Sequence, residues 1–408
     1  MHSLILALKN AFRNGRRTLV TLLAIAFGLA AINLFSGYVA NVYKGLEDLA
    51  VMGERLGHLT LTKRGFWLEG KLDPTPYLIA PEEAQRIENV LRAEPHIKHV
   101  SPRLGLNGLA SNGRASTIFI SESIAPADDQ ALGGSALGYS NGQLDAQNEI
   151  GVAVSSDLAK LLNLQQDTVF SLLSSTFDGQ ANAVDAMVTD VFNTGTASTN
   201  DKFILLPLKL AQALLNTDAI ERFVVVLDDA GMTETMGEQL QDNLRAAGID
   251  VEFRTWKQLS NFYTQVKSLF DVIFSFIASI VLVISAMSVA NTMSMAVVER
   301  TREIGTLRAL GLSQNGVIRL FALEGFWIAA FGCLLGLILT LVVALGINLA
   351  QIGYIPPNLS TEVPLQVDLD WLRILSTALV VTVFAVLCAA YPAYKATRNE
   401  IVDALTFV

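Results

Sequence analysis

The sequence predicts an α-helical membrane protein with four transmembrane helices and a large α/β extracytoplasmic domain. Hydrophobic residues occupy 51% of the 408 positions and charged residues only 16%, whereas an average soluble domain has roughly 25% charged residues. The apolar residues are concentrated in four long runs, and a long polar segment separates the first run from the second. These observations divide the chain into helices that cross a membrane and a domain that faces water.

The four apolar runs are 18–42, 268–298, 320–350 and 371–394. Each is long enough to cross a hydrocarbon layer of roughly 30 Å. The charged residues within them are Asp271, Glu324 and Arg373. A secretory signal peptide has an apolar core of only about 7 to 15 residues and then a small-residue cleavage site. The first run is longer and lacks such a site, so we expect it to be a retained transmembrane helix.

Basic residues in the short segments indicate the orientation, because Lys and Arg stay on the cytoplasmic side. They lie before the first run, between the second and third, and after the fourth: Lys9, Arg13, Arg16, Arg17, Arg300, Arg302, Arg308, Arg319, Lys395 and Arg398. The segment 351–370 has none. We therefore expect 1–17, 299–319 and 395–408 to be cytoplasmic, and 43–267 and 351–370 to lie outside.

The external segment 43–267 reads as mixed α/β. Short β-rich runs occur at 59–62, 117–120 and 223–227, and helical patterns occur at 81–94 and 232–247. The part from about 106 to 200 is rich in Gly, Ser, Asn and Ala, which predicts an inserted β-rich subdomain with long loops. The segment has 29 acidic and 18 basic side chains, a net charge of −11. It has no basic face for nucleic acid, so we expect no nucleic-acid partner.

Signals for catalysis or metal binding are weak. Ser140 lies in a G-x-S-x-G sequence, but its flanks are Gly-rich and lack the strand and helix that a nucleophile elbow needs. His96 and His99 have no cysteine or carboxylate cluster beside them and are interpreted as surface residues. Cys333 and Cys388 lie in apolar runs and read as small buried hydrophobes. The sequence has no phosphate-binding loop. We therefore expect no catalytic residue, metal or cofactor here, and any ATP must be hydrolysed by another chain.

The most specific motif follows the second run, at 298–311, and reads V-E-R-T-R-E-I-G-T-L-R-A-L-G. Ile304, Leu307 and Leu310 recur every three residues, which predicts an apolar stripe along a short helix with charges around it. Such a helix can fit into a groove on another protein while its charges fix the register. The alternative is an ordinary basic loop that only sets the topology.

This motif, with Glu324 early in the next run, resembles the signature of FtsX-like ABC transporter permeases, the superfamily of MacB, LolC and LolE. The segment 6–19 resembles the family's amphipathic entry helix, and 391–396 resembles the exit of its last span. The tail departs from the pattern: family members often have a proline before the final Ala-Leu, here Ala404 and Leu405.

The resemblance implies mechanotransmission in the bacterial inner membrane. In this mechanism a separate pair of cytoplasmic ATP-binding subunits moves a coupling helix, and the long second span carries the motion outward. The residues of this sequence that match the coupling motif are Glu299, Arg300, Arg302, Glu303, Ile304, Gly305, Leu307, Arg308 and Gly311. The resemblance also implies a non-catalytic chain that pairs with a second copy or a close paralogue. The expected partners include membrane lipid and a periplasmic adaptor or lipoprotein, and the expected cargo is a lipoprotein, a lipid-like molecule or another amphiphile.

Polar and small residues in the spans have structural explanations as well. A charge in the bilayer is costly, so we expect Glu324 to reach the interface or to pair with a basic group of the coupling segment, and a direct functional role is the alternative. Gly332 and Gly336 have the G-x-x-x-G spacing, which indicates a dimer seam only weakly. For the whole chain, the alternative functions are a membrane-anchored periplasmic sensor or enzyme regulator without transport, and a hydrolase that rests on Ser140 alone.

Overall fold

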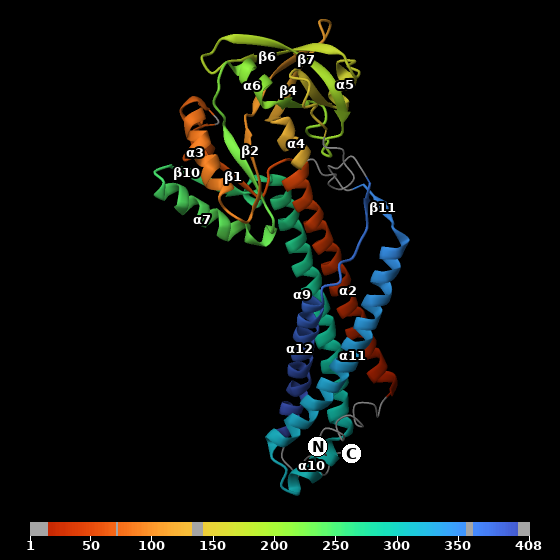
Figure 1. Ribbon diagram of the computed structural model, residues 1–408. Helices are drawn as coiled ribbons and strands as arrows, with labels where there is room; N and C mark the ends of the chain where they lie inside the picture. The colour runs from red at the N-terminus through yellow and green to blue at the C-terminus, as the bar shows by residue number, and fades with distance from the viewer. Residues whose placement is uncertain (1–14, 71, 133–141, 356–361, 399–408) are drawn as a thin grey trace. The chain divides into compact units, whose positions relative to one another are not determined.

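The computed structural model describes residues 15–70, 72–132, 142–355 and 362–398 (Figure 1). The chain divides into two compact units. The helical unit comprises Met1–Val42, Lys267–Ile352 and Pro364–Val408, and the α/β unit comprises Tyr43–Val266 and Gly353–Val363.

Within the described residues, four helices are long and apolar enough to cross a membrane: α2 (Gly15–Asp48), α9 (Asn261–Glu299), α11 (Gln314–Ala350) and α12 (Trp371–Thr397). The π-helical turn η1 (Leu49–Gly53) extends α2. Each apolar run lies inside one of these helices. Helices α2 and α9 extend beyond their runs at both ends, α11 only at its start and α12 only at its end, because residues such as Lys, Glu and Gln favour a helix about as well as Leu does. The predicted amphipathic helix at 1–17 lies outside the described residues except for 15–17, which belong to α2.

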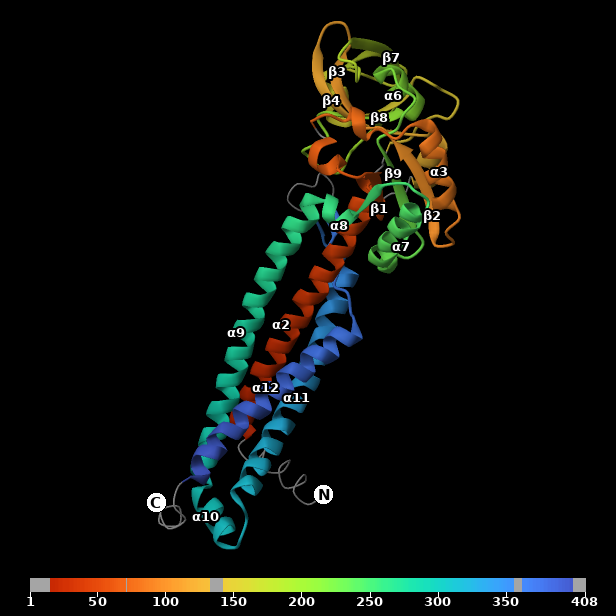
Figure 2. The ribbon, with the colours of Figure 1, turned by 90° about the vertical axis from the view of Figure 1, so that its left-hand side faces the viewer.

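Glycines allow close packing within the helical unit. A Cβ atom at Gly336 would lie 2.9 Å from the backbone oxygen of Ala26, and one at Gly332 would lie 2.8 Å from the side chain of Ile25. The G-x-x-x-G pair of α11 therefore contacts α2 of the same chain. Helices α11 and α12 run side by side (Figures 1 and 2), and Gly325 packs against Ala389.

The α/β unit contains a four-stranded antiparallel sheet, in the order β10 (Val251–Thr255), β1 (Leu59–Lys63), β9 (Arg222–Leu227) and β2 (Ile97–Arg103). One face packs on α3 (Pro81–Arg92) and α7 (Thr233–Ala246) through a buried apolar cluster. Side chains alternate along a strand, so the other face carries Thr60, Arg103 and Arg222. The helices predicted at 81–94 and 232–247 are confirmed. Pro81 at the first position and the acidic first turn of α3 suit a helix N-terminus.

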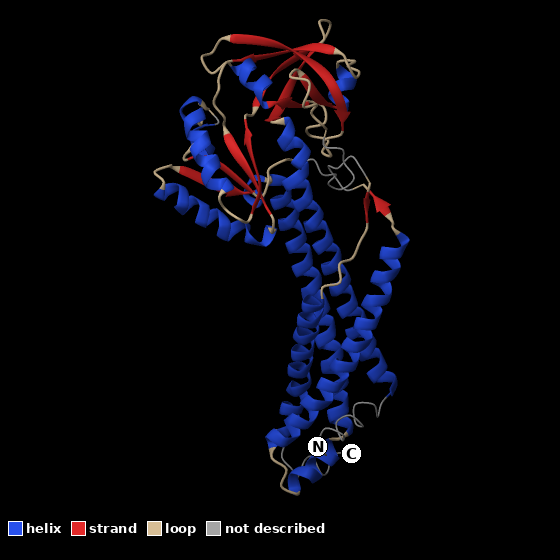
Figure 3. Ribbon diagram, viewed as in Figure 1, coloured by secondary structure: helices blue, strands red, loops and turns tan. Residues whose placement is uncertain are grey.

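The rest of the α/β unit is a closed six-stranded barrel (Figure 3). In barrel order its strands are β3 (Leu106–Ser111), β4 (Ser116–Ile124), β8 (Phe203–Pro207), β5 (Gly151–Ser155), β7 (Ala181–Phe192) and β6 (Val169–Ser175). Short helices α4 (Pro126–Leu132) and α5 (Ser156–Leu161) lie between barrel strands, and α6 (Leu208–Leu215) follows β8 and leads to β9 of the sheet. The β-rich insertion expected at about 106–200 holds five of these strands, and β8 and α6 follow it. Its interior is apolar, with Phe119, Val154 and Leu172 fully buried.

The remaining elements are short. They are η2 (Phe66–Gly70), η3 (Thr75–Tyr77), η4 (Ala230–Met232), α8 (Trp256–Leu259), α10 (Thr301–Ala309), β11 (Gly353–Tyr354) and β12 (Val363–Pro364). The last two strands pair with each other in the connection between α11 and α12.

Candidate coupling site

The coupling motif forms helix α10, which is shorter than the single segment expected at 299–319. Helix α9 ends at Glu299, and Arg300 leaves helical geometry with φ −112° and ψ 14°. Helix α10 then ends at Ala309, and Gly311 follows the cap residue with a φ of +99°, which is strained for other residues. The Gly311 amide donates to the Arg308 carbonyl and the Leu312 amide to the Leu307 carbonyl. This bonding is a Schellman C-cap, so the motif's last glycine terminates the helix.

The three apolar residues of the motif do not share one environment. Ile304 is only 6% exposed and packs with Val317 and Phe321 in the core of the helical unit. Leu307 is 39% exposed and Leu310 is 81% exposed. The expectation of one apolar docking edge through all three residues is therefore wrong for Ile304. That residue anchors α10, and the open surface carries Leu307 and Leu310.

The charged residues of the motif also separate by position. Arg302 and Glu303 lie exposed in the first turn of α10, Gly305 is buried beside Ile304, and Arg308 is half-buried in the last turn. An acidic residue near the start of a helix and a basic residue near its end both favour the helix dipole.

Arg300 and Glu324 form a buried ion pair at the root of α10. Nη1 of Arg300 donates to Oε1 of Glu324 over 2.8 Å, and the two side chains are 9% and 2% exposed. Glu324 thus pairs with a basic residue of the coupling segment. The pair links the end of α9 to α11 about three turns from its start, on either side of α10. Removing one partner of such a buried pair strongly destabilises a protein, because the other charge stays buried without compensation.

Three further contacts join α9 to α2. Arg17 donates to Glu299 over 2.7 Å, and the hydroxyl groups of Thr21 and Thr292 lie 2.6 Å apart. Ser288 lies at 3.5 Å from Thr21. Small polar side chains therefore hold two of the apolar helices together. Local sequence pattern does not identify which of these residues pair, since the residues of each pair are far apart in the chain.

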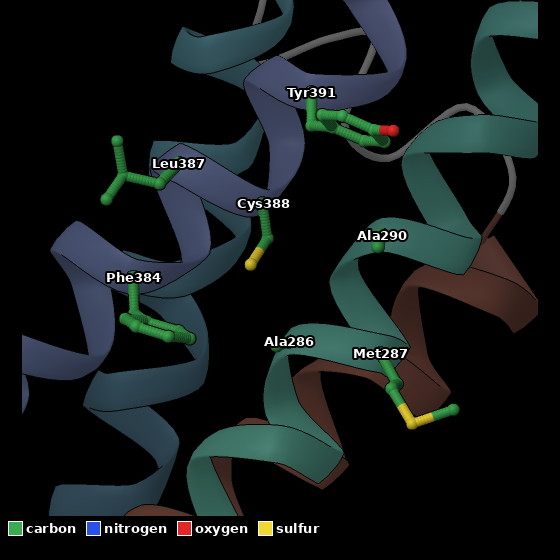
Figure 4. A pocket seen from close by; sticks show the side chains of 7 residues that line it. All are labelled: Ala286, Met287, Ala290, Phe384, Leu387, Cys388 and Tyr391. Atoms are coloured by element: carbon green, nitrogen blue, oxygen red, sulfur yellow. The ribbon is translucent and has the colours of Figure 1, made fainter.

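A groove of about 380 Å³ lies between α9 and α12 (Figure 4). Ala286, Met287 and Ala290 line it from α9, and Cys388 and Tyr391 are among the residues that line it from α12. Cys388 projects into this space and Cys333 is buried. The groove is almost wholly apolar.

Other sequence signals give no site within the described residues. Ser140 lies outside them. His96 and His99 contact different carboxylates, Asp228 at 3.3 Å and Asp128 at 3.2 Å. His96 is exposed as expected, whereas His99 is half-buried. Among the residues that the structure describes, no group of three metal-binding side chains occurs.

Comparisons with known proteins bear on both units. The family model of the MacB-like periplasmic core domain matches residues 18–243, more than half of the chain, and that of the FtsX-like permease C-terminal region matches 275–401. The ABC transporter permease YtrF of Bacillus subtilis is 34% identical over 32% of this chain and 31% of its own length. The chain thus spans about a third of that relative.

Two longer matches cover most of both chains. The lipoprotein-releasing system transmembrane protein LolE of Haemophilus influenzae is 22% identical over 78% of this chain and 79% of its own. LolC of Xylella fastidiosa is 20% identical over 96% of this chain and 94% of its own. Together with the two family models, the second of which includes the coupling motif, these matches lead to one conclusion: the chain belongs to the FtsX-like ABC transporter permeases, in the superfamily of MacB, LolC and LolE.

Proposed function

We propose that the chain couples ATP hydrolysis by a separate pair of cytoplasmic ATP-binding subunits to a conformational change of its periplasmic α/β unit. The observation that carries this proposal is the two-sided character of α10. Ile304 anchors one side in the helical core, while Leu307 and Leu310 remain open to a partner. Exposed apolar residues flanked by charges suit a helix that docks in a groove of another protein.

The connections of α10 allow a push on it to reach the apolar helices. The Arg300–Glu324 pair joins the segments before and after α10, and Arg17 extends the connection to α2 through Glu299. A packed core shifts between discrete arrangements rather than deforming continuously. An ATP-binding subunit that grips Leu307 and Leu310 would therefore move α9 and α11 together.

The orientation that this mechanism requires is the one that the basic residues favour. Both termini and α10 face the cytoplasm, and the α/β unit lies in the periplasm of a cell with an inner membrane. The coupling residues are Glu299, Arg300, Arg302, Glu303, Leu307 and Arg308, with Ile304, Gly305 and Gly311 shaping the helix.

The cargo that we propose is a lipoprotein, a lipid-like molecule or another amphiphile that is extracted or exported. LolC and LolE are transmembrane proteins of lipoprotein-releasing systems, and they support this class because they match along most of the chain. The complex would contain a second copy of the chain or a close paralogue, and a periplasmic adaptor or lipoprotein would receive the cargo.

Affinity purification of the full chain from its own cells tests the coupling. We expect a Walker-type ATPase to copurify with the wild type and to be lost from Leu307→Asp and Leu310→Asp. Leu161→Asp is the matched control, because Leu161 is 61% exposed on α5, away from the motif. If no nucleotide-binding subunit accompanies a folded and active wild type, the chain acts without energy coupling, as a sensor or regulator would.

A further inference from the structure

A second cavity lies in the α/β unit, between the barrel and the sheet face opposite α3 and α7. Its volume is about 510 Å³, within the range of roughly 300 to 1,000 Å³ that is usual for small-molecule sites. Thr60 and Arg222 line it from the sheet, and Leu106 and Ile120 line it from the barrel. The segment η2 and the turn after β6 contribute to its walls as well.

One part of the cavity is apolar and partly aromatic. Phe66 and Trp67 come from η2, and Phe177 comes from the turn between β6 and β7. Their rings are held in place: Phe66 packs edge-on against Trp67, with ring centroids 5.3 Å apart, and Arg254 lies over Trp67 at 5.0 Å. Fixed aromatic surfaces of this kind bind an apolar body at little entropic cost.

The polar part of the cavity is rich in hydrogen-bond acceptors. Glu221 lines it and accepts from the Gly105 amide over 3.2 Å and from Arg222. A carboxylate has about four acceptor positions, so Glu221 retains capacity for another donor. Arg222 also donates to Glu122 over 2.5 Å, so two carboxylates already occupy this guanidinium.

Charges around Arg222 disfavour an anion here. Burial would lower the pKa of Arg222, but Glu122 and Glu221 outweigh burial and hold that pKa above its ordinary value. Arg103, opposite Arg222 in the register of β2 and β9, is fully buried, and burial lowers its pKa to about 10. Arg222 is therefore not placed to gain much from a ligand carboxylate or phosphate, and Arg103 does not line the cavity, whereas Glu221 can accept from a donor.

We propose that this cavity binds a small amphiphile, with its apolar body against Phe66, Trp67 and Phe177 and with an amine or amide head donating to Glu221. The site lies within the α/β unit of one chain. Binding at this site therefore requires neither an ATP-binding subunit nor a second copy of the chain. It can be tested independently of the coupling proposed for α10.

Photocrosslinking of the full chain in lipid nanodiscs tests this site. The probe is aminomethyl-benzophenone, which has a two-ring apolar body and an amine head, and the counter-probe is the benzophenone carboxylate. We expect the amine probe to label peptides that contain Phe66, Trp67 or Phe177. The carboxylate should label them about tenfold less, because a hydrogen bond to a charged group corresponds to at least one decade in affinity.

Two variants and one control sharpen the result. Asn107→Trp places a large ring at an exposed residue that lines the cavity and should abolish this labelling, while Leu109→Trp, two residues along the same strand, should not. Glu221→Gln retains an oxygen that can accept from Gly105 and should remove the preference for the amine. Wild-type labelling confined to the apolar helices, or unchanged labelling in Asn107→Trp, would overturn the site. An unchanged preference in Glu221→Gln would overturn the assignment of the head group.

Discussion

Arg300 donates to Glu324 over 2.8 Å across the root of the coupling helix, and both side chains are almost completely buried. The charged group that follows α9 and the carboxylate that lies within α11 therefore neutralise each other. This relationship explains how an acidic residue is accommodated in an apolar helix, and it ties the coupling helix to the two helices that flank it.

Glu324→Ala should destabilise the helical unit, because it leaves the Arg300 guanidinium buried without its carboxylate. The expected loss is about 3–5 kcal/mol in the free energy of unfolding, measured by denaturant titration of the full chain in detergent micelles. The double variant Arg300→Met with Glu324→Leu should recover most of this loss, since apolar residues of similar volume need no charge partner. Equal destabilisation in the single and double variants would contradict this account.

Substitutions at Ile304 and Leu310 should have different effects, the first on the stability of the chain and the second on its proposed coupling to the ATPase. Ile304→Ala removes a buried side chain and should cost about 2–5 kcal/mol in the free energy of unfolding. Leu310→Ala should change it by no more than about 0.5 kcal/mol, because Leu310 is on the surface. In the assembled complex, the same Leu310 variant should lower ATPase stimulation. A large stability loss in Leu310→Ala would mean that this side chain is packed.

Gly336 and Gly346 form a matched pair within α11. A side chain at Gly336 would meet the Ala26 backbone, whereas nothing lies within 4 Å of a Cβ at Gly346. Gly336→Leu should therefore separate α11 from α2 and lower the apparent melting temperature in detergent by several degrees more than Gly346→Leu does. Equal melting temperatures in the two variants would show that the close approach of α11 to α2 is wrong.

His58 should make the α/β unit sensitive to acid. Burial, the largest effect, lowers its pKa, and its Nδ1 accepts from the Leu227 amide over 3.0 Å, which only the neutral ring can do. The unfolded chain therefore binds more protons than the folded one between the lowered pKa and the ordinary value of about 6.5. The contribution of His58 to the stability of the folded chain is fully present above about pH 6.5, and it decreases as the pH falls through this window.

His58→Asn should reduce that pH dependence, because the amide oxygen can accept from Leu227 without titrating. The measurement is the apparent melting temperature of the α/β unit transition in the full chain, from neutral pH to acid. His96→Asn is the control, since His96 is exposed, and should leave the profile unchanged. A wild-type profile that His58→Asn does not alter would exclude His58 as its source.

Local pattern predicts much of this fold. The four apolar helices follow from runs long enough to cross a bilayer, and α3 and α7 follow from their apolar spacing and end residues. The order of the barrel strands could not be predicted this way. Strand β8 inserts between β4 and β5, pairing parallel with the first and antiparallel with the second, and such long-range pairing leaves no local trace.

The position of the candidate coupling site was predictable from the sequence. Which of its residues are buried and which are exposed was not. The spacing of three residues predicts one stripe through Ile304, Leu307 and Leu310. At 3.6 residues per turn, however, Ile304 and Leu310 point about 120° apart around α10. Only packing decides which of them is buried. Similarly, the sequence indicated that Glu324 needs a basic partner, but several arginines of the coupling segment met that need equally.

Site-specific crosslinking from α10 tests directly whether this helix contacts an ATP-binding subunit. A benzoylphenylalanine residue would replace Leu310 in the full chain in cells, with the same residue in place of Leu161 as the control. We expect irradiation to join position 310, but not position 161, to a cytoplasmic nucleotide-binding subunit. If position 310 of a folded chain crosslinks to lipid alone or to no nucleotide-binding protein, α10 is not the coupling helix.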